Sequence, residues 1–191
     1  MKKCSSKKYG LLIAFNLLFP LILALPVESA AQSSALKLII IRHAERPDKG
    51  ENLSCAGFNR SVLLPAVLLR KFGLPNQIFI PSLNNGSVAK RCRMLETIAP
   101  YAVKYNLSIN SKYDEDDSNG LSAALLKQTG TVIIVWDHGK IPEILTALGI
   151  TRYLKWERDD FDSILIITFQ KGKPVLKIDK EGINPPQGCP F

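Results

Sequence analysis

The sequence predicts an α/β fold, a three-layer α/β/α sandwich around a mostly parallel central sheet. Short apolar, β-branched runs alternate along the chain with segments of helical periodicity. The loops that join them are short, which suits strands that run in parallel and helices that cover both faces of a sheet. Two of the apolar runs, 36–41 and 131–136, each end next to one of the two histidines of the chain.

The first half is expected to contain two strands and two helices, in the order strand 36–41, helix 55–72, strand 77–80 and helix 89–104. Ser54 is an N-cap residue for the first helix, and Gly73 with Pro75 supplies the stop signal after it. Polar loops are expected at 47–52 and 82–87.

The second half is expected to add a minor edge strand and then helices that alternate with longer strands. The order is strand 108–110, acidic loop 113–120, helix 121–129, strand 131–136, helix 141–148 and hairpin strands 164–169 and 174–178. Gly149 stops the last helix, and Lys171-Gly172-Lys173 forms the hairpin turn.

Residues 1–31 have the pattern of a secretory signal peptide. A basic start precedes an apolar core at 11–25, and small residues follow at 27–31. The apolar core is shorter than the ~20 residues that span a bilayer. We therefore expect an exported protein, periplasmic or secreted, with a single domain over 32–191 that ends in a Pro-rich tail. Membrane contact is expected only through this segment if it stays uncleaved.

Charge and cysteine content narrow the classes of partner. Net charge falls from +8 to +5 (21 basic minus 16 acidic residues) once 1–31, with four lysines and one glutamate, is removed. That excess suits small anionic substrates, and no basic helix indicates nucleic-acid binding.

The mature chain has three cysteines, Cys55, Cys92 and Cys189, so at least one thiol does not pair within the chain. The sequence does not select the pairing, although Cys189 could hold the tail.

The two histidines lie where a ligand site is expected. Arg42 and His43 follow the first strand, and Asp137 and His138 follow strand 131–136. In open α/β sheets, ligands bind beyond the carboxyl ends of the strands. A permanently charged arginine suits a phosphate or carboxylate, so the pair predicts phosphoryl transfer with histidine as the covalent carrier.

Four motifs in order resemble the histidine phosphatase superfamily, whose fold is phosphoglycerate mutase-like. The resemblance covers about residues 36 to 178, and the ending Trp-Asp-His-Gly-x-Ile-Pro is similar to small bacterial members. The motifs are Arg42-His43-Ala44-Glu45, Leu53-Ser54-Cys55-Ala56-Gly57-Phe58-Asn59-Arg60, Arg93-Met94-Leu95-Glu96-Thr97-Ile98-Ala99-Pro100 and Val135-Trp136-Asp137-His138-Gly139.

The resemblance implies a two-step reaction. His43 takes the phosphoryl group, and water then hydrolyses the phosphohistidine. Arg42 and Arg93 clamp the phosphate oxygens, and His138 completes the pocket. Arg91 competes with Arg93 for this role, because a two-residue shift would place it at the same helix start.

Two further assignments stay open. Arg46 is either another phosphate contact or an ion-pair partner of Glu45 or Asp48. The usual glutamate acid of the family has no match here, and the acidic loop with Asp114 and Glu115 occupies roughly its region. Glu115 is slightly favoured for its longer reach; Asp137 is the alternative, and Glu45 is the third choice.

The expected function is therefore an exported phosphatase that hydrolyses small phosphomonoesters or anhydrides. The alternative is a non-catalytic phosphate-binding module on the same fold, and a mutase is a third option. No cofactor and no metal are expected, because the histidines are assigned to phosphate and no carboxylate–histidine cluster at ligand spacing is left. The sequence carries no indication of the oligomeric state.

Overall fold

The computed structural model describes residues 35–83, 90–151 and 155–189. The chain divides into two units, 1–31 and 32–191, and the expected signal segment lies outside the described residues. Within the described ranges, no helix has both the length and the hydropathy of a membrane span.

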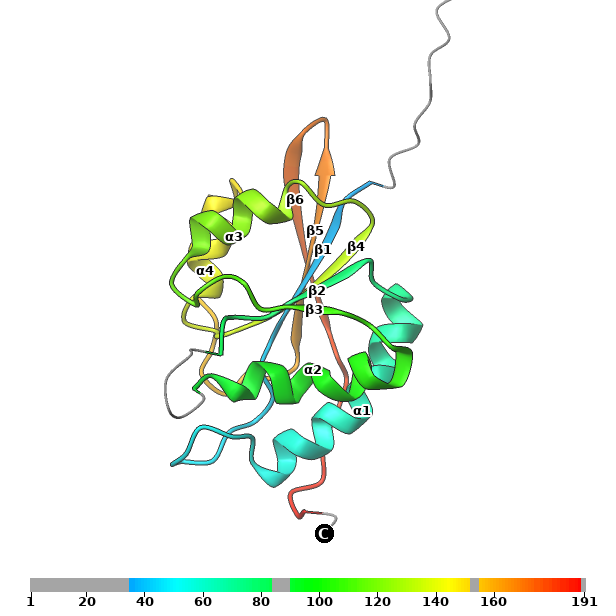
Figure 1. Ribbon diagram of the computed structural model, residues 1–191, viewed down its shortest axis with the longest axis vertical. Coiled ribbons are helices and arrows are strands. Elements are labelled where there is room, and N and C mark those ends of the chain that lie inside the picture. Colours follow the sequence, from blue (N-terminus) through cyan, green and yellow to red (C-terminus); the bar gives the residue numbers. More distant parts are fainter. Residues whose placement is uncertain (1–34, 84–89, 152–154, 190–191) are drawn as a thin grey trace, which may run out of the picture. The chain divides into compact units, whose positions relative to one another are not determined.

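The centre of the domain is a mixed sheet. Six strands of the described chain form it, in the order β3-β2-β4-β1-β5-β6 (Figure 1). The first four in this order run in parallel, whereas β5 and β6 form the predicted antiparallel hairpin at one edge. The strands are β1 (Lys37–Arg42), β2 (Gln77–Phe79), β3 (Ile109–Asn110), β4 (Thr131–Trp136), β5 (Ser163–Gln170) and β6 (Lys173–Lys180).

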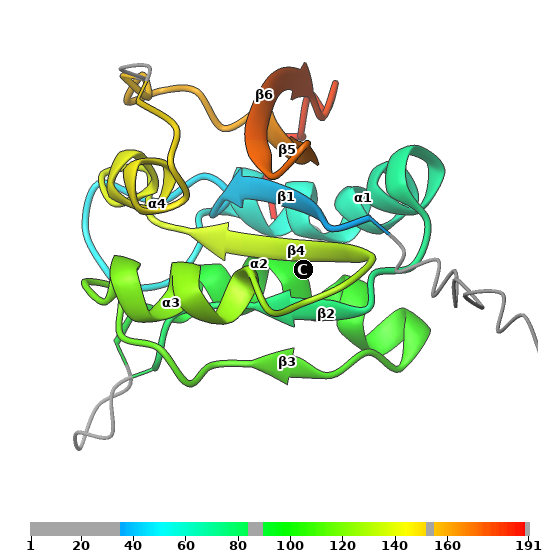
Figure 2. The same cartoon turned by 90° about the horizontal axis from the view of Figure 1, so that it is seen from above.

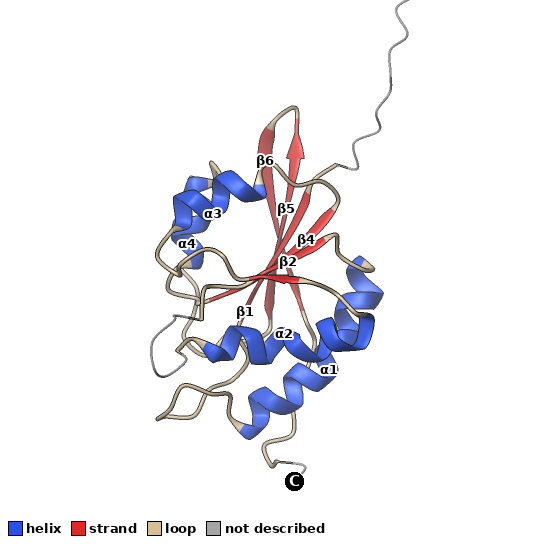
Figure 3. Cartoon of the chain, viewed as in Figure 1, coloured by secondary structure: helices blue, strands red, loops and turns tan. Residues whose placement is uncertain are grey.

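Helices cover both faces of this sheet, which confirms the three-layer prediction (Figures 2 and 3). Alternate side chains of β1 separate the two layers: Leu38 and Ile40 pack with the α3–α4 layer, and Ile39 and Ile41 pack with the α1–α2 layer. The helices found in the described ranges are α1 (Cys55–Phe72), α2 (Cys92–Tyr105), α3 (Ser118–Leu125) and α4 (Ile141–Ala147).

Helix α2 starts later than predicted. The expected start at residue 89 is wrong, because Arg91 has a left-handed backbone with φ of 61° and the helix begins at Cys92. The Arg91 side chain forms no capping hydrogen bond with the first turn of α2. Most of the expected loop 82–87 lies outside the described residues.

Helix α3 is shifted toward the N-terminus of its predicted range, 121–129. Its N-cap is Asp117, whose carboxylate accepts a hydrogen bond of 2.8 Å from the Gly120 N–H. That cap starts the helix at Ser118, and the helix ends at Leu125. Asp117, which was expected to lie in the acidic loop, thus caps the helix, and the apolar pattern did not indicate this start.

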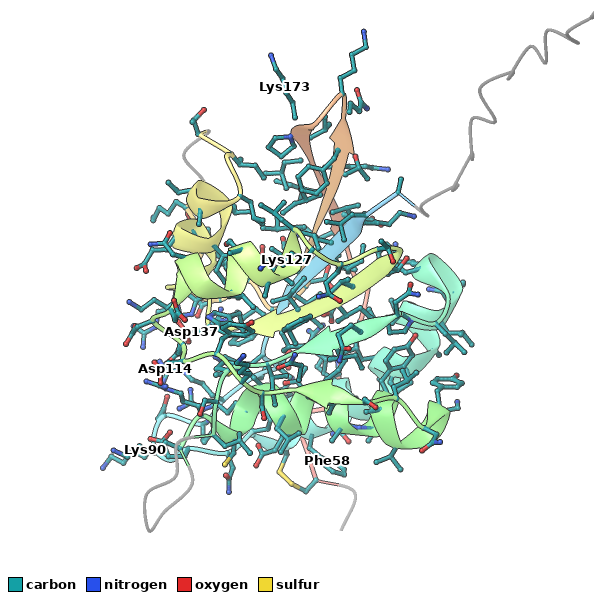
Figure 4. The ribbon with its side chains drawn as sticks, turned by 45° about the horizontal axis from the view of Figure 1, so that its top comes forward. Phe58, Lys90, Asp114, Lys127, Asp137 and Lys173 are labelled. Atoms are coloured by element: carbon teal, nitrogen blue, oxygen red, sulfur yellow. A yellow bond between two sulfur atoms is a disulfide. The ribbon has the colours of Figure 1, made fainter. Side chains whose placement is uncertain are left out.

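Helix α1 begins where its cap was predicted, since Ser54 accepts from the Gly57 N–H at 3.2 Å. A disulfide joins Cys55 to Cys189 and ties the C-terminal tail to this helix start. Asn59 adds hydrogen bonds to tail carbonyl oxygens, and among the described cysteines Cys92 is free. The disulfide is visible as a yellow bond beside Phe58 (Figure 4).

Candidate active site

The two histidine motifs meet at one edge of the sheet. Strands β1 and β4 are parallel neighbours, and Arg42 is the register partner of Trp136. The His43 N–H donates to the Trp136 carbonyl oxygen at 3.2 Å, which extends the pairing past the strand end. His43, Asp137 and His138 therefore share the carboxyl edge of the sheet, as the sequence predicted.

The backbone fixes the tautomer of His43. Its Nδ1 lies 2.7 Å from the Ala44 carbonyl oxygen, which can only accept, so Nδ1 carries the proton. The other nitrogen, Nε2, then has a free lone pair, and it is buried without a hydrogen-bond partner among the described residues. The side chain is 1% exposed. A neutral, oriented imidazole of this kind is the form that a nucleophile needs.

Asp137 and His138 lie against this nitrogen. The distance from Asp137 Oδ2 to His43 Nε2 is 3.6 Å, and Asp137 Oδ1 lies 3.5 Å from His138 Nδ1. Burial alone would raise the pKa of Asp137, but His43, the Gly139 N–H and His138 hold that pKa well below its usual range. Burial, and then the charge of Arg42, lower the pKa of His138.

Arg42 brings a buried cation to the same place. It is 2% exposed, and its guanidinium carbon lies 3.9 Å from the centre of the Phe161 ring. Its Nη1 donates only to the Arg158 and Asp160 carbonyl oxygens, and no carboxylate of the described residues forms an ion pair with it. Burial lowers the pKa of Arg42 to about 10 despite the attraction of Asp137. An anion would satisfy this charge.

Arg46 is exposed and lines a cavity of about 170 Å³ together with Arg42. Its charge further lowers the pKa of Arg42. Within the described chain Arg46 forms neither of the two expected ion pairs, with Glu45 or with Asp48, and the alternative, a phosphate contact, stays a prediction. The remaining lining residues are Pro47, Asp48, Arg158, Asp159 and Phe161.

Arg93 lies in a different cavity of about 350 Å³, which also contains Asp137. The Arg93 guanidinium donates to the Glu51 carbonyl oxygen at 3.1 Å and forms an ion pair with the Glu51 carboxylate at 3.5 Å. Arg42 and Arg93 thus line two different cavities, and Asp137 lines the one that contains Arg93. Asp137 and Lys90 of this cavity lie at the same side of the molecule as Asp114 (Figure 4). The other lining residues are Lys90, Arg91, Met94, Glu115 and Lys140.

Thr97 ties the first turn of α2 to the histidine loop. The Ala44 N–H donates to Thr97 Oγ1 at 2.8 Å, and that hydroxyl donates to the Arg93 carbonyl oxygen at 2.7 Å. This link holds Arg93 next to the residue after His43. Arg91 instead holds the acidic loop through Asp114 and Glu115, at 2.7 and 2.8 Å.

The carboxylates proposed as general acid differ in their surroundings. Asp114 is exposed, and hydrogen bonds from the Asp116 N–H and Arg91 lower its pKa. Burial, and then the charge of Asp137, raise the pKa of Glu115, which lines the cavity with Asp137. The Trp136 indole N–H donates to the Glu115 carbonyl oxygen at 3.1 Å and fixes the loop. A raised pKa is what a proton donor needs, so Glu115 is the best placed.

The sequence did not reveal a buried ion cluster next to this site. Arg60 donates to Glu45 at 2.8 to 2.9 Å and to Glu181 at 2.7 Å, with Asp162 at 3.7 Å. Burial raises the pKa of Glu181 to about 7, although Arg60 opposes this shift. Glu45, the third choice as acid, is committed to this cluster. A Cβ atom on residue 57 would lie only 2.1 Å from the Glu45 carbonyl oxygen, so this position requires glycine.

The structure brings the two histidines together with a carboxylate. One ligand atom each of His43, Asp137 and His138 lie within 4.8 Å of one another. The sequence analysis assigned both histidines to phosphate, and its expectation that no metal binds stays a prediction.

Comparisons with known proteins show the fold. No family model matches the chain, and no curated protein matches its sequence. Among solved structures, the protein histidine phosphatase SixA complexed with tungstate has a TM-score of 0.58 at 14% identity, over 76% of this chain and 97% of that one. Phosphoglycerate mutase from Plasmodium falciparum has a TM-score of 0.55 at 11% identity, over 83% and 98%.

A mutant phosphoserine phosphatase from Entamoeba histolytica, in complex with phosphoserine, has a TM-score of 0.52 at 15% identity, over 76% of this chain and 96% of that one. The domain therefore has the fold of these proteins, the phosphoglycerate mutase-like fold that the four motifs predicted. At these identities the likeness concerns the fold, and the activity has to be argued from the site.

Proposed function

We propose that this domain is a phosphatase of the histidine type, which hydrolyses small phosphomonoesters or phosphoanhydrides through a phosphohistidine at His43. The observation that carries the proposal is the state of His43: Nδ1 is held by the Ala44 carbonyl oxygen, and Nε2 is buried with a free lone pair. Arg42 supplies an uncompensated cation directly beside it. Proteins of the same fold include a phosphoserine phosphatase and a protein histidine phosphatase, which supports the same proposal.

The reaction has two displacements. His43 Nε2 attacks phosphorus, the bond to the leaving oxygen breaks, and Glu115 gives that oxygen a proton. Water then attacks the phosphohistidine, the P–N bond breaks, and the Glu115 carboxylate takes the water proton. Cationic groups aimed at the phosphoryl oxygens provide most of the catalysis in such transfers. We assign that role to Arg42 and Arg93, with Arg46 as an outer contact and the neutral His138 as a hydrogen-bond partner.

Export is part of the proposal. The Cys55–Cys189 disulfide suits an oxidising compartment such as the periplasm or the extracellular space, where such bonds persist. The tail that it fixes also carries Glu181, which belongs to the buried cluster with Arg60. The signal pattern at 1–31 supports export of the chain, after which the disulfide can form in that compartment.

The test is hydrolysis of an aryl phosphate by the wild type, by His43→Ala and by the surface control Lys127→Ala. We expect His43→Ala to lose at least about four orders of magnitude in turnover, because loss of a nucleophile removes the covalent route. The control should keep wild-type activity. Near-normal turnover in His43→Ala would overturn the proposal. Tungstate binding by a wild type without turnover would instead indicate a phosphate-binding module.

A further inference from the structure

We propose that His43, Asp137 and His138 also form a binding site for a divalent transition-metal ion such as Zn²⁺. The ligand atoms would be His43 Nε2, one oxygen of Asp137 and His138 Nδ1. This site is distinct in chemistry from the phosphatase activity, because its ligand is a cation rather than a phosphoryl group.

The spacing of these atoms is close to that of a metal site. Ligands on one tetrahedral zinc ion are about 3.3 Å apart, given metal–ligand bonds of about 2.0 to 2.2 Å. The distance from His43 Nε2 to Asp137 Oδ2 is 3.6 Å, and that from His138 Nδ1 to Asp137 Oδ1 is 3.5 Å. All three ligand atoms lie within 4.8 Å of one another, so small rotations of the side chains suffice.

Two of the three atoms have no other interaction. His43 Nε2 and His138 Nδ1 are both buried without a hydrogen-bond partner in the part of the chain that the structure describes. His43 is 1% exposed, so its unpartnered nitrogen is aimed at Asp137 inside the protein. Burying a polar nitrogen without a partner is unfavourable, and a bound ion would satisfy both nitrogens at once.

The surrounding hydrogen bonds have the arrangement that supports metal ligands. A ligating histidine usually donates its other ring N–H to a carbonyl oxygen, as His43 Nδ1 does to Ala44. A ligating carboxylate is usually hydrogen-bonded in turn, as Asp137 Oδ1 is by the Gly139 N–H at 2.8 Å. These contacts orient the lone pair of His43 and the carboxylate without using the atoms that would bind the ion.

The charge of Arg42 opposes a cation at this site, and the attraction between Arg42 and the Asp137 carboxylate offsets part of that opposition. The Arg42 guanidinium donates to the Arg158 and Asp160 carbonyl oxygens and stacks on Phe161. The ionised Asp137 supplies the negative charge at the centre.

The donor set selects the kind of ion. Two imidazole nitrogens and one carboxylate suit Zn²⁺ and similar first-row ions, whereas Mg²⁺ and Ca²⁺ need mostly oxygen ligands. Three protein ligands leave a coordination position open. The lone pair of His43 Nε2 cannot bind a metal and phosphorus at once, so the ion would block phosphorylation of His43, a consequence that rests on the proposed function.

The test is calorimetric titration of the chelator-treated full chain with ZnCl₂ alone. We expect one bound Zn²⁺ per chain, with affinity lowered at least about a hundredfold by Asp137→Asn or by His138→Ala, since each removes a ligand. Cys92→Ser, which removes the free thiol, and Asp179→Asn, which removes a distant carboxylate, should bind as the wild type. Mg²⁺ should give no signal. With Co²⁺, the visible absorption of a low-coordinate site should appear in the wild type and not in Asp137→Asn.

Absence of Zn²⁺ binding in the wild type, or unchanged affinity in both ligand variants, would overturn this site. Retention of phosphatase activity in that case would leave the proposed function in place. Stoichiometric, Asp137-dependent Zn²⁺ binding in a chain that hydrolyses no phosphoester would support the site and reject the proposed function. In an active enzyme, Zn²⁺ should inhibit competitively, and a chelator should relieve the inhibition.

Discussion

Arg42 and Arg60 are both buried, at 2% and 4% exposure, but they lie in regions of opposite character. Arg60 donates to Glu45 and Glu181, and hydrogen bonds and charges from both raise its pKa against the effect of burial. Arg42 donates only to carbonyl oxygens, and burial lowers its pKa to about 10. One guanidinium has its anions within the protein, and the other does not.

This difference distinguishes an arginine that stabilises the fold from one that is available to bind a ligand. A buried cation whose hydrogen bonds are satisfied holds elements together, and here it joins α1, the loop after β1 and the tail after β6. A buried cation without an anion retains binding energy that a ligand can use. The comparison predicts that loss of Arg60 should affect stability and that loss of Arg42 should affect activity.

The largest effect on folding is expected from Arg60→Met. The substitution leaves Glu181 and Glu45 without their cation, and breaking a buried pair from one side costs about 3–5 kcal/mol. Urea unfolding should show this loss. Lys71→Met, which breaks the more exposed Lys71–Asp179 pair, is the control and should cost under about 1 kcal/mol. Equal losses of unfolding free energy in the two variants would mean that the buried Arg60 cluster stabilises the fold no more than a surface ion pair does.

Arg42→Met tests the other half of the comparison. Its kcat/KM for an aryl phosphate should fall about 10²- to 10³-fold, because a preorganised donor to the transferring group is lost. Its free energy of unfolding should stay within about 1 kcal/mol of the wild type, since an apolar chain replaces an unpaired buried charge. Arg42→Lys should recover only part of the activity, because it keeps the charge without the planar fork. A stability loss as large as that of Arg60→Met would contradict this assignment.

Arg93 and Arg91 form a second, smaller comparison at the start of α2. Arg93→Ala should lower kcat/KM by roughly two orders of magnitude, about 3 kcal/mol, if it clamps phosphate. Arg91→Ala should cost less, because Arg91 is paired with Asp114 and Glu115 in the free protein. The reverse ranking of the two variants would mean that Arg91 is the phosphate ligand.

Glu115→Gln should have an effect that depends on the leaving group. Hydrolysis of an alkyl phosphate should fall at least about tenfold, whereas an activated aryl phosphate needs little protonation and should be spared. Because the Glu115 pKa is raised, alkyl phosphate activity in the wild type should be lost as pH rises through that pKa, and Glu115→Gln should abolish this limb. Asp114→Asn and Asp137→Asn are the comparison variants, and if one of them shows this selectivity instead, that residue is the acid.

The strand ends, and with them most of the site, could be predicted from the sequence. Apolar runs that each end at a histidine motif located β1 and β4, and parallel pairing then brought His43 and Asp137 to one edge. The cluster of Arg60 and Glu181 could not be predicted, because the two residues are 121 positions apart and no motif links them. The start of α3 could not be predicted because Asp117 lies in a run of acidic residues, and the sequence does not show that its carboxylate accepts the capping hydrogen bond.

The sequence also could not predict that Arg42 and Arg93 line two different cavities. The resemblance implies that Arg42 and Arg93 clamp one phosphate, and this stays a prediction; without a ligand, the Arg42 guanidinium stacks on Phe161. Packing of this kind depends on the 158–161 loop, which carries no sequence signal for contact with β1. The same holds for Asp137, whose position between the two histidines follows from a turn closed by the Gly139 N–H.

The most direct test of the central claim is the isolation of a phosphoenzyme. Wild-type protein should be mixed with an aryl phosphate, quenched in alkali within one turnover and examined by mass spectrometry of its peptides. We predict one phosphoryl group on His43 that is stable to alkali, lost in acid and absent from His43→Ala. A phosphoryl group on another residue, or steady turnover by wild type with no phosphorylated His43 at any quench time, would contradict the account.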